Sequence, residues 1–218
     1  KSGVPVIALV GYTNVGKSSL LNRLCGAEVL EANMLFATLD PTARKLTLPS
    51  GLATVAVDTV GFVSRLPHGL VKAFKSTLEE AAYADVILKV CDAADPASAQ
   101  QLAVTDSVLA ELGCADIPQL VVYNKCDLAG SIALFDTSAV RTSAKTGQGL
   151  AELLARIDAL LAGRVRRVAV LLPYDKLSAA APLRRRGTVL AEEYRPEGLY
   201  LEGIVKAMDL HLLEDYLV

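Results

Sequence analysis

The sequence contains no tryptophan, and aromatic residues make up only 5% of its 218 residues. A platform of stacked aromatic rings for single-stranded nucleic acid is therefore not expected. No apolar run approaches the roughly 20 residues that a membrane-spanning helix needs, and no secretory signal is recognisable. We therefore expect a cytoplasmic protein without integral membrane association. Because the chain begins with Lys1 rather than methionine, we also expect a fragment of a longer protein.

The sequence has no excess of one sign of charge, and it contains few cysteines. The 22 lysines and arginines against 24 aspartates and glutamates give a net charge of −2, so any nucleic-acid contact needs a local basic patch. The four cysteines lack the spacing of metal ligands, and we interpret them as free thiols in a reducing compartment. With 52% hydrophobic residues, the chain can build one sizeable core, or one core and a small module.

Strand and helix patterns alternate along the first part of the chain. Apolar runs predict strands at 6–10, 46–48, 53–57, 86–90, 119–123 and 138–142. Helical periodicity predicts helices at 17–24, from Pro67 onward, at 97–112 and at 150–161. Strands that alternate with helices indicate an α/β fold with a doubly wound, mostly parallel sheet, and a Pro-Ser-Gly turn at 49–51 indicates one hairpin.

The pattern changes after Gly163. Strands are predicted at 168–172, 188–194 and 199–206, with helices at 175–185 and 209–217. We interpret residues 1–163 as one domain and residues 164–218 as a small β-α-β-β-α module. The alternative is an extension of the main sheet.

Residues 11–18 match the phosphate-binding pattern G-x-x-x-x-G-K-[ST], between a predicted strand and a predicted helix. Backbone N–H groups of such a loop, together with the helix N-terminus, attract phosphate. Lys17 is predicted to reach the β- and γ-phosphates and to act in catalysis, and the Ser18 hydroxyl to ligate Mg²⁺. The nucleotide-binding residues predicted here are Gly11, Tyr12, Thr13, Asn14, Val15, Gly16, Lys17, Ser18 and Ser19.

A second motif, D-x-x-G at residues 58–61, follows a predicted strand. Asp58 is expected to hold Mg²⁺ through a water, and the N–H of Gly61 to contact the γ-phosphate and act in catalysis. Thr38 lies in the loop before the hairpin, where a threonine can close over the metal and the γ-phosphate, so it is predicted as a metal ligand and catalytic residue. Thr42 is the alternative.

A third motif, N-K-x-D at residues 124–127, also follows a predicted strand. Guanine presents two N–H donors side by side, and the Asp127 carboxylate can accept both, whereas adenine would leave that carboxylate unpaired. Asn124 is expected to bond the base or brace the phosphate loop, and the stem of Lys125 to cover the base plane. Backbone N–H groups of Ser143, Ala144 and Lys145 are expected to meet the guanine carbonyl, so the predicted ligands are GTP and GDP.

These motifs, together with residues 35–42, 58–62 and 66–71, resemble the HflX family of ribosome-associated GTPases. The resemblance covers about residues 6–218. It implies GTP hydrolysis, binding to the large ribosomal subunit and its RNA, and a role in splitting stalled or idle ribosomes. It also implies a glycine-rich N-terminal domain, which these residues do not include.

Phe62 occupies the position where Ras-like enzymes carry the glutamine that orients the attacking water. We therefore predict slow unassisted hydrolysis, about 10⁻³ s⁻¹ or less, and a ribosome-dependent increase. Asn14 resembles an asparagine that holds K⁺ in related GTPases, the alternative being a side chain that bonds the loop backbone. Arg44, Arg65 and His68 are further candidates for hydrolysis, although each also fits a solvent-exposed position.

Two other functions remain open at this point. The chain could be a nucleotide-gated binding module in which hydrolysis only resets a docking surface. It could also be a GTPase of tRNA modification or ribosome assembly. A basic run at 184–186, together with Arg164, Arg166 and Arg167, fits either a site for ribosomal RNA phosphates or a solvated face.

Overall fold

The computed structural model describes residues 4–26, 43–59, 61, 81–128 and 138–218. The predicted helix from Pro67, the threonines at 38 and 42, and the candidates Phe62, Arg65 and His68 lie outside these residues. Within them the chain forms two sheets, one of six strands and one of three.

The larger sheet has the strand order β2-β3-β1-β4-β5-β6. Neighbouring strands run parallel except for β2, which pairs antiparallel with β3 across the predicted hairpin. The bounds are β1 Val6–Val10, β2 Ala43–Thr47, β3 Ala53–Asp58, β4 Val86–Asp92, β5 Gln119–Asn124 and β6 Val140–Arg141. The predicted α/β class with a mostly parallel sheet is thus confirmed.

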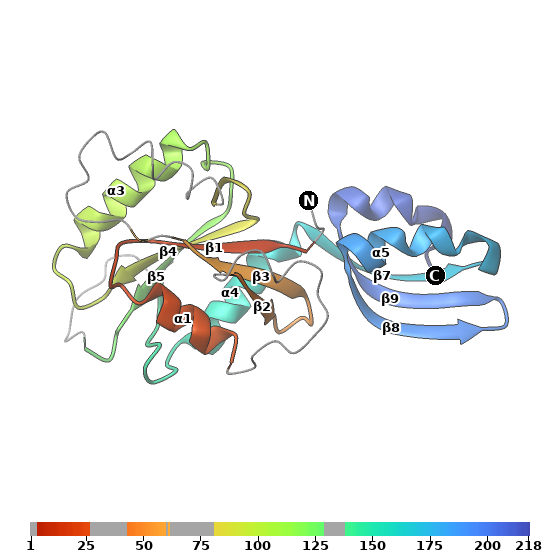
Figure 1. Ribbon diagram of the computed structural model, residues 1–218, viewed down its shortest axis with the longest axis horizontal. Coiled ribbons are helices and arrows are strands. Elements are labelled where there is room, and N and C mark those ends of the chain that lie inside the picture. The colour runs from red at the N-terminus through yellow and green to blue at the C-terminus, as the bar shows by residue number, and fades with distance from the viewer. Residues whose placement is uncertain (1–3, 27–42, 60, 62–80, 129–137) are drawn as a thin grey trace.

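Helices cover both faces of this sheet because alternate strand residues point to opposite sides. Ile7 and Leu9 pack in one apolar cluster with residues of α1 (Lys17–Leu24) and α4 (Leu150–Ala162). Ala8 and Val10, from the same strand, pack in a second cluster with α3 (Ser98–Glu111). Figure 1 accordingly shows α3 on one side of the strands and α1 and α4 on the other. None of the described helices is long and apolar enough to span a bilayer.

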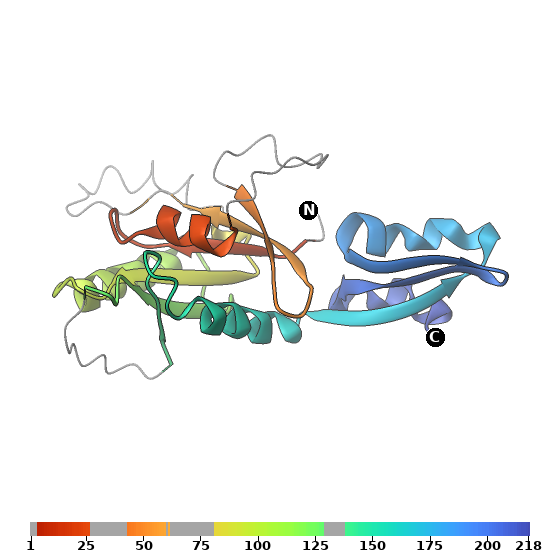
Figure 2. The same cartoon turned by 90° about the horizontal axis from the view of Figure 1, so that it is seen from below.

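The second sheet is antiparallel, has the order β7-β9-β8, and carries a hydrophobic cluster of its own. Its strands are β7 Val165–Leu172, β8 Thr188–Arg195 and β9 Gly198–Lys206. In both views it lies beside the larger sheet and does not continue it, so the alternative of an extended main sheet is wrong for the described residues (Figure 1 and Figure 2).

Two helix predictions in this part of the chain are wrong in detail. In place of one helix at 175–185, a 3₁₀-helix at Tyr174–Ala180 (η1) is followed by the short α5 at Ala181–Arg186. Pro182 has no N–H to give to the carbonyl of the preceding turn, so the helix restarts there. The segment predicted as a helix at 209–217 forms two 3₁₀-helices, η2 Ala207–Leu212 and η3 Glu214–Tyr216.

The two sheets meet at the amino ends of the larger sheet's strands. Lys206 Nζ, at the end of β9, lies 3.3 Å from Asp85 Oδ1, and Asp85 Oδ2 accepts a 2.9 Å hydrogen bond from the backbone N–H of Val6. Ile204 of β9 packs into the first apolar cluster. Among the described residues, these contacts lie at the end of the sheet away from its carboxyl edge, where sheets of this kind bind ligands.

Two glycines next to helices both have positive φ, but a side chain would clash at one of them and would meet open space at the other. Gly149, before α4, has φ 73°, and a Cβ there would lie 1.8 Å from the Arg141 carbonyl oxygen. Gly113 has φ 72° and no heavy atom within 4 Å of such a Cβ. We expect Gly113→Ala to cost about 1–2 kcal/mol, a few degrees in melting temperature, and Gly149→Ala to cost clearly more. Equal melting temperatures of the two variants would contradict this packing.

Candidate functional site

The loop at residues 11–18 runs from the end of β1 into α1, and its backbone lies close to neighbouring strands. Gly11 has φ 156°, and a Cβ there would lie 2.2 Å from the Val90 carbonyl oxygen. A Cβ on Gly16, with φ 91°, would lie 2.4 Å from Asn124 Nδ2. Only glycine fits at these two places, which explains the glycine spacing of the motif.

Lys17 is almost fully buried, with 7% of its surface exposed. Its ammonium donates hydrogen bonds to the carbonyl oxygens of Gly11 (3.1 Å) and Tyr12 (2.9 Å). Burial lowers the pKa of Lys17, and the nearby Asp58 carboxylate partly offsets this effect. The loop therefore holds a buried cation whose hydrogen bonds go to carbonyl oxygens of the loop itself.

Ser18 and Asp58 form the part of the site that suits a metal ion. The Ser18 hydroxyl donates to Asp58 Oδ2, which joins the first helix to the end of β3. Asp58 Oδ1 is buried and has no hydrogen-bond partner among the described residues. An unsatisfied carboxylate oxygen beside a hydroxyl oxygen is a donor set that fits Mg²⁺, which takes few protein ligands when phosphates supply the others.

The glycine of the second motif touches the first motif. A Cβ on Gly61 would lie 2.7 Å from Lys17 Nζ and 2.9 Å from the backbone N and Cα of Thr13. A larger residue at 61 would therefore push against the phosphate loop. In the sequence, 39 residues (19–57) separate the two motifs, and the fold brings them together.

Asn124 joins the phosphate loop to the loops that follow β5 and β6. It is 1% exposed. Its Nδ2 donates to the Val15 carbonyl at 3.0 Å, and its Oδ1 accepts from the Ala144 backbone N–H at 3.0 Å. Both ends of one buried amide are thus used, and of the two roles predicted for Asn124 this geometry matches the bracing one.

Asp127 lies in an exposed position at the same edge of the sheet. Its Oδ1 accepts a 2.6 Å hydrogen bond from the Ser143 hydroxyl, which itself accepts from the N–H of Thr146 at 3.1 Å. The carboxylate is therefore held in a defined position while the residue remains accessible. Lys145 is also exposed, next to the half-buried Ala144.

Lys125 makes contacts that the sequence did not suggest. Its ammonium donates to the Asn14 carbonyl at 2.6 Å and pairs with Asp92 Oδ2 at 2.7 Å. Asp92, the last residue of β4, was not predicted as a site residue. The signal that could have found it is its place as a carboxylate directly after an apolar run whose end reaches the same edge.

Several other candidates take no part in these contacts. Ser19 is exposed on α1, and Arg44 is exposed on β2.

Among the described residues, no group of three or more His, Cys, Asp or Glu side chains could hold a metal by itself. The cysteines at 25, 91, 114 and 126 are free, as predicted.

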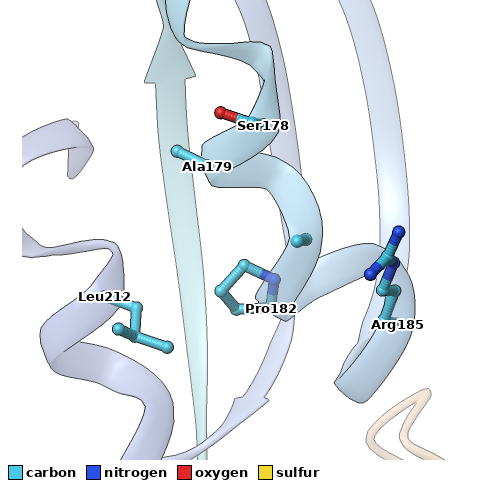
Figure 3. A pocket seen from close by; sticks show the side chains of 6 residues that line it. Ser178, Ala179, Pro182, Arg185 and Leu212 are labelled. Carbon is cyan, nitrogen blue, oxygen red and sulfur yellow. The ribbon is translucent and has the colours of Figure 1, made fainter.

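A separate cavity of about 330 Å³ lies in the C-terminal part of the chain (Figure 3). Leu212 lies across it from Pro182. Arg185 is the one charged residue of its lining, which lacks the carboxylates and the glycine-rich backbone that phosphate and metal binding need. The cavity is lined by Ser178, Ala179, Ala181, Pro182, Arg185 and Leu212.

Comparison with known proteins agrees with this geometry. The model of a family described as 50S ribosome-binding GTPase matches residues 6–125. GTPase HflX of Caldanaerobacter subterraneus subsp. tengcongensis is 43% identical over 218 residues, which cover 100% of this chain and 51% of that protein. GTPase HflX of Escherichia coli K12 is 42% identical over 180 residues, 79% of this chain and 42% of that protein. The chain thus spans about half the length of the curated relatives it matches.

Solved structures give the same result for the fold. A GTP-binding protein from Sulfolobus solfataricus in complex with GDP is 28% identical with a TM-score of 0.58, over 72% of this chain and 52% of that one. A single-residue variant of Aquifex aeolicus Era bound to GDP·AlF4⁻ is 29% identical with a TM-score of 0.52, over 71% of this chain and 56% of that one.

Removal of the Asn124 amide tests the bracing of the site. Asn124→Ala leaves the Val15 carbonyl and the Ala144 N–H unpaired, so we expect a loss of about 1–3 kcal/mol per group in the free energy of unfolding. Asn22→Ala, at an exposed position on α1, is the matched control and should change stability by less than about 0.5 kcal/mol. Urea unfolding measures the free energy of unfolding of both variants. Similar losses in the two would show that the buried amide does not brace the site.

Proposed function

Because this chain belongs to the HflX family of P-loop GTPases, we propose that it binds GTP together with Mg²⁺, hydrolyses it slowly alone, and does so faster on the large ribosomal subunit. The bonds of Asn124 carry this proposal, since they join a phosphate-binding loop to a base-binding loop. We further propose a cytoplasmic protein with a GTPase domain at 1–163 and a smaller module at 164–218.

Guanine selection is assigned to Asp127. Its accessible carboxylate, oriented by Ser143, can accept the two adjacent N–H groups of guanine. Adenine offers no such donors, so binding it would leave a desolvated carboxylate unpaired. The backbone N–H groups of residues 143–145 are assigned to the guanine carbonyl.

Phosphate binding is assigned to residues 11–19 and Gly61. Nucleotide oxygens would replace the Gly11 and Tyr12 carbonyls as partners of the Lys17 ammonium, which then faces the developing negative charge. Ser18 and Asp58 would hold Mg²⁺, which neutralises charge on the β- and γ-phosphates when it is bound. The close approach of Gly61 to Lys17 supports a γ-phosphate contact by its N–H. Thr38 remains the proposed third metal ligand and catalytic residue.

The ribosomal part of the proposal is supported by the family description and by Phe62. The family's description names the 50S ribosome, and GTPase HflX of Caldanaerobacter subterraneus subsp. tengcongensis matches the whole of this chain. A phenylalanine after the D-x-x-G motif can neither donate nor accept a hydrogen bond to the attacking water. Fast hydrolysis therefore needs another group to position the water, and the ribosome is the proposed source. Splitting of stalled or idle ribosomes is the proposed role.

Turnover with and without ribosomal subunits tests this role. We expect about 10⁻³ s⁻¹ or less for the chain alone and an increase of at least roughly a hundredfold with large subunits, measured as phosphate release at saturating GTP. Small subunits are the matched control and should have no effect. GTP-dependent binding to large subunits without faster turnover would instead support the nucleotide-gated binding module.

Exchange of the base-reading carboxylate gives an independent test. Asp127→Asn replaces one acceptor with a donor, which matches the carbonyl that xanthine carries where guanine has its amino group. We expect GDP affinity to fall at least roughly a hundredfold and xanthosine diphosphate to become the better ligand. Asp116→Asn changes an exposed aspartate outside the site and should leave both affinities unchanged. Unaltered preference for GDP in Asp127→Asn would refute the assignment.

A further inference from the structure

Asn14 and Lys125 are the two non-glycine residues with positive φ among the described residues, at 64° and 63°. Each lies in a loop of the nucleotide site, although more than a hundred residues separate them in the sequence. The left-handed backbone region is unfavourable for residues with a Cβ, so it persists only where surrounding contacts enforce it. Asparagine tolerates this region better than lysine does, so Lys125 in particular needs contacts that hold it there.

One ammonium group makes that contact. Lys125 Nζ donates to the Asn14 carbonyl oxygen at 2.6 Å, so the two left-handed residues are joined directly. The same nitrogen lies 2.7 Å from Asp92 Oδ2. The stem of Lys125 runs past Gly16, where a Cβ would lie 3.8 Å from Lys125 Cε. The Lys125 side chain thus crosses the phosphate loop from Gly16 to Asn14.

Contacts other than the one with Lys125 also position Asp92. Its Oδ1 accepts a 2.9 Å hydrogen bond from the Ala94 N–H, and its backbone is in register with Asn124 across β4 and β5. The Asp92 side chain is 17% exposed and that of Lys125 is 31% exposed, so water screens their attraction only in part. The carboxylate therefore offers the lysine a single, preformed position.

We propose that Asp92 is a positioning residue that prolongs the binding of guanine nucleotides by holding Lys125 against the Asn14 carbonyl. This inference rests on the proposed function. Asp92 itself touches neither base nor phosphate in this assignment; it acts through Lys125, which keeps the phosphate loop in its binding shape. Without the carboxylate, the lysine gains freedom and the Asn14 carbonyl loses its donor, so nucleotide leaves sooner.

The test uses Asp92→Asn, which keeps the shape and an acceptor for the Ala94 N–H but removes the charge. The dissociation constant and dissociation rate of GDP should rise roughly tenfold in this variant. Affinity for inosine diphosphate, which lacks the exocyclic amino group, should fall by the same factor because base reading is untouched. A changed ratio of the two affinities would contradict the inference.

Asp106→Asn is the matched control. Asp106, on α3, also pairs with a lysine, Lys89 of β4, at 2.6 Å, but this pair lies outside the site. It should leave GDP binding unchanged. Lys125→Met keeps the stem and removes the ammonium, so it should reproduce the increase even if Asp92→Asn fails to fold. In the Lys125→Met background, Asp92→Asn should add less than about twofold if the two residues act as one unit.

The outcomes separate this inference from the function on which it rests. Unchanged GDP dissociation in Asp92→Asn, an equal effect of Asp106→Asn, or additive effects of Asp92→Asn and Lys125→Met would each overturn the role of Asp92 while GDP binding stands. If the unsubstituted chain binds no GDP, the proposed function fails and the inference fails with it.

Discussion

A single buried side-chain amide, that of Asn124, determines the geometry of the candidate site. It donates to the phosphate loop at Val15 and accepts from the loop after β6 at Ala144. A buried polar group with both ends satisfied stabilises one arrangement and disfavours others, because any shift leaves an unpaired group in a desolvated place. The distance between the predicted base-binding and phosphate-binding residues is therefore set by hydrogen bonds of fixed length.

The sheet places these groups within reach of one another. Parallel strands bring β1, β3, β4 and β5 to a common carboxyl edge, and each of these strands ends next to a residue of the site. The second sheet contacts the opposite edge through Lys206 and Asp85. The chain thus keeps its structural contacts and its candidate ligand site at different ends of the same strands.

Sequence patterns predicted the strands, the three described helices of the larger unit and the order of the motifs, since these depend on local periodicity and spacing. These patterns failed where contacts between distant parts of the chain determine where an element begins or ends. The strand predicted at 138–142 shortens to Val140–Arg141, and Pro182 divides a helix predicted as continuous. Asp92 escaped notice because its partner Lys125 lies 33 residues away. The backbone conformations of Asn14 and Lys125 likewise follow from contacts between loops, which no local pattern encodes.

Calorimetric titration with GDP and with ADP, both in the presence of Mg²⁺, tests the central claim most directly. If Asn124 holds a guanine-reading carboxylate and a phosphate loop in one pocket, GDP binds and ADP does not bind at the same concentrations. Equal binding of the two nucleotides, or binding of neither, would contradict this account of the site.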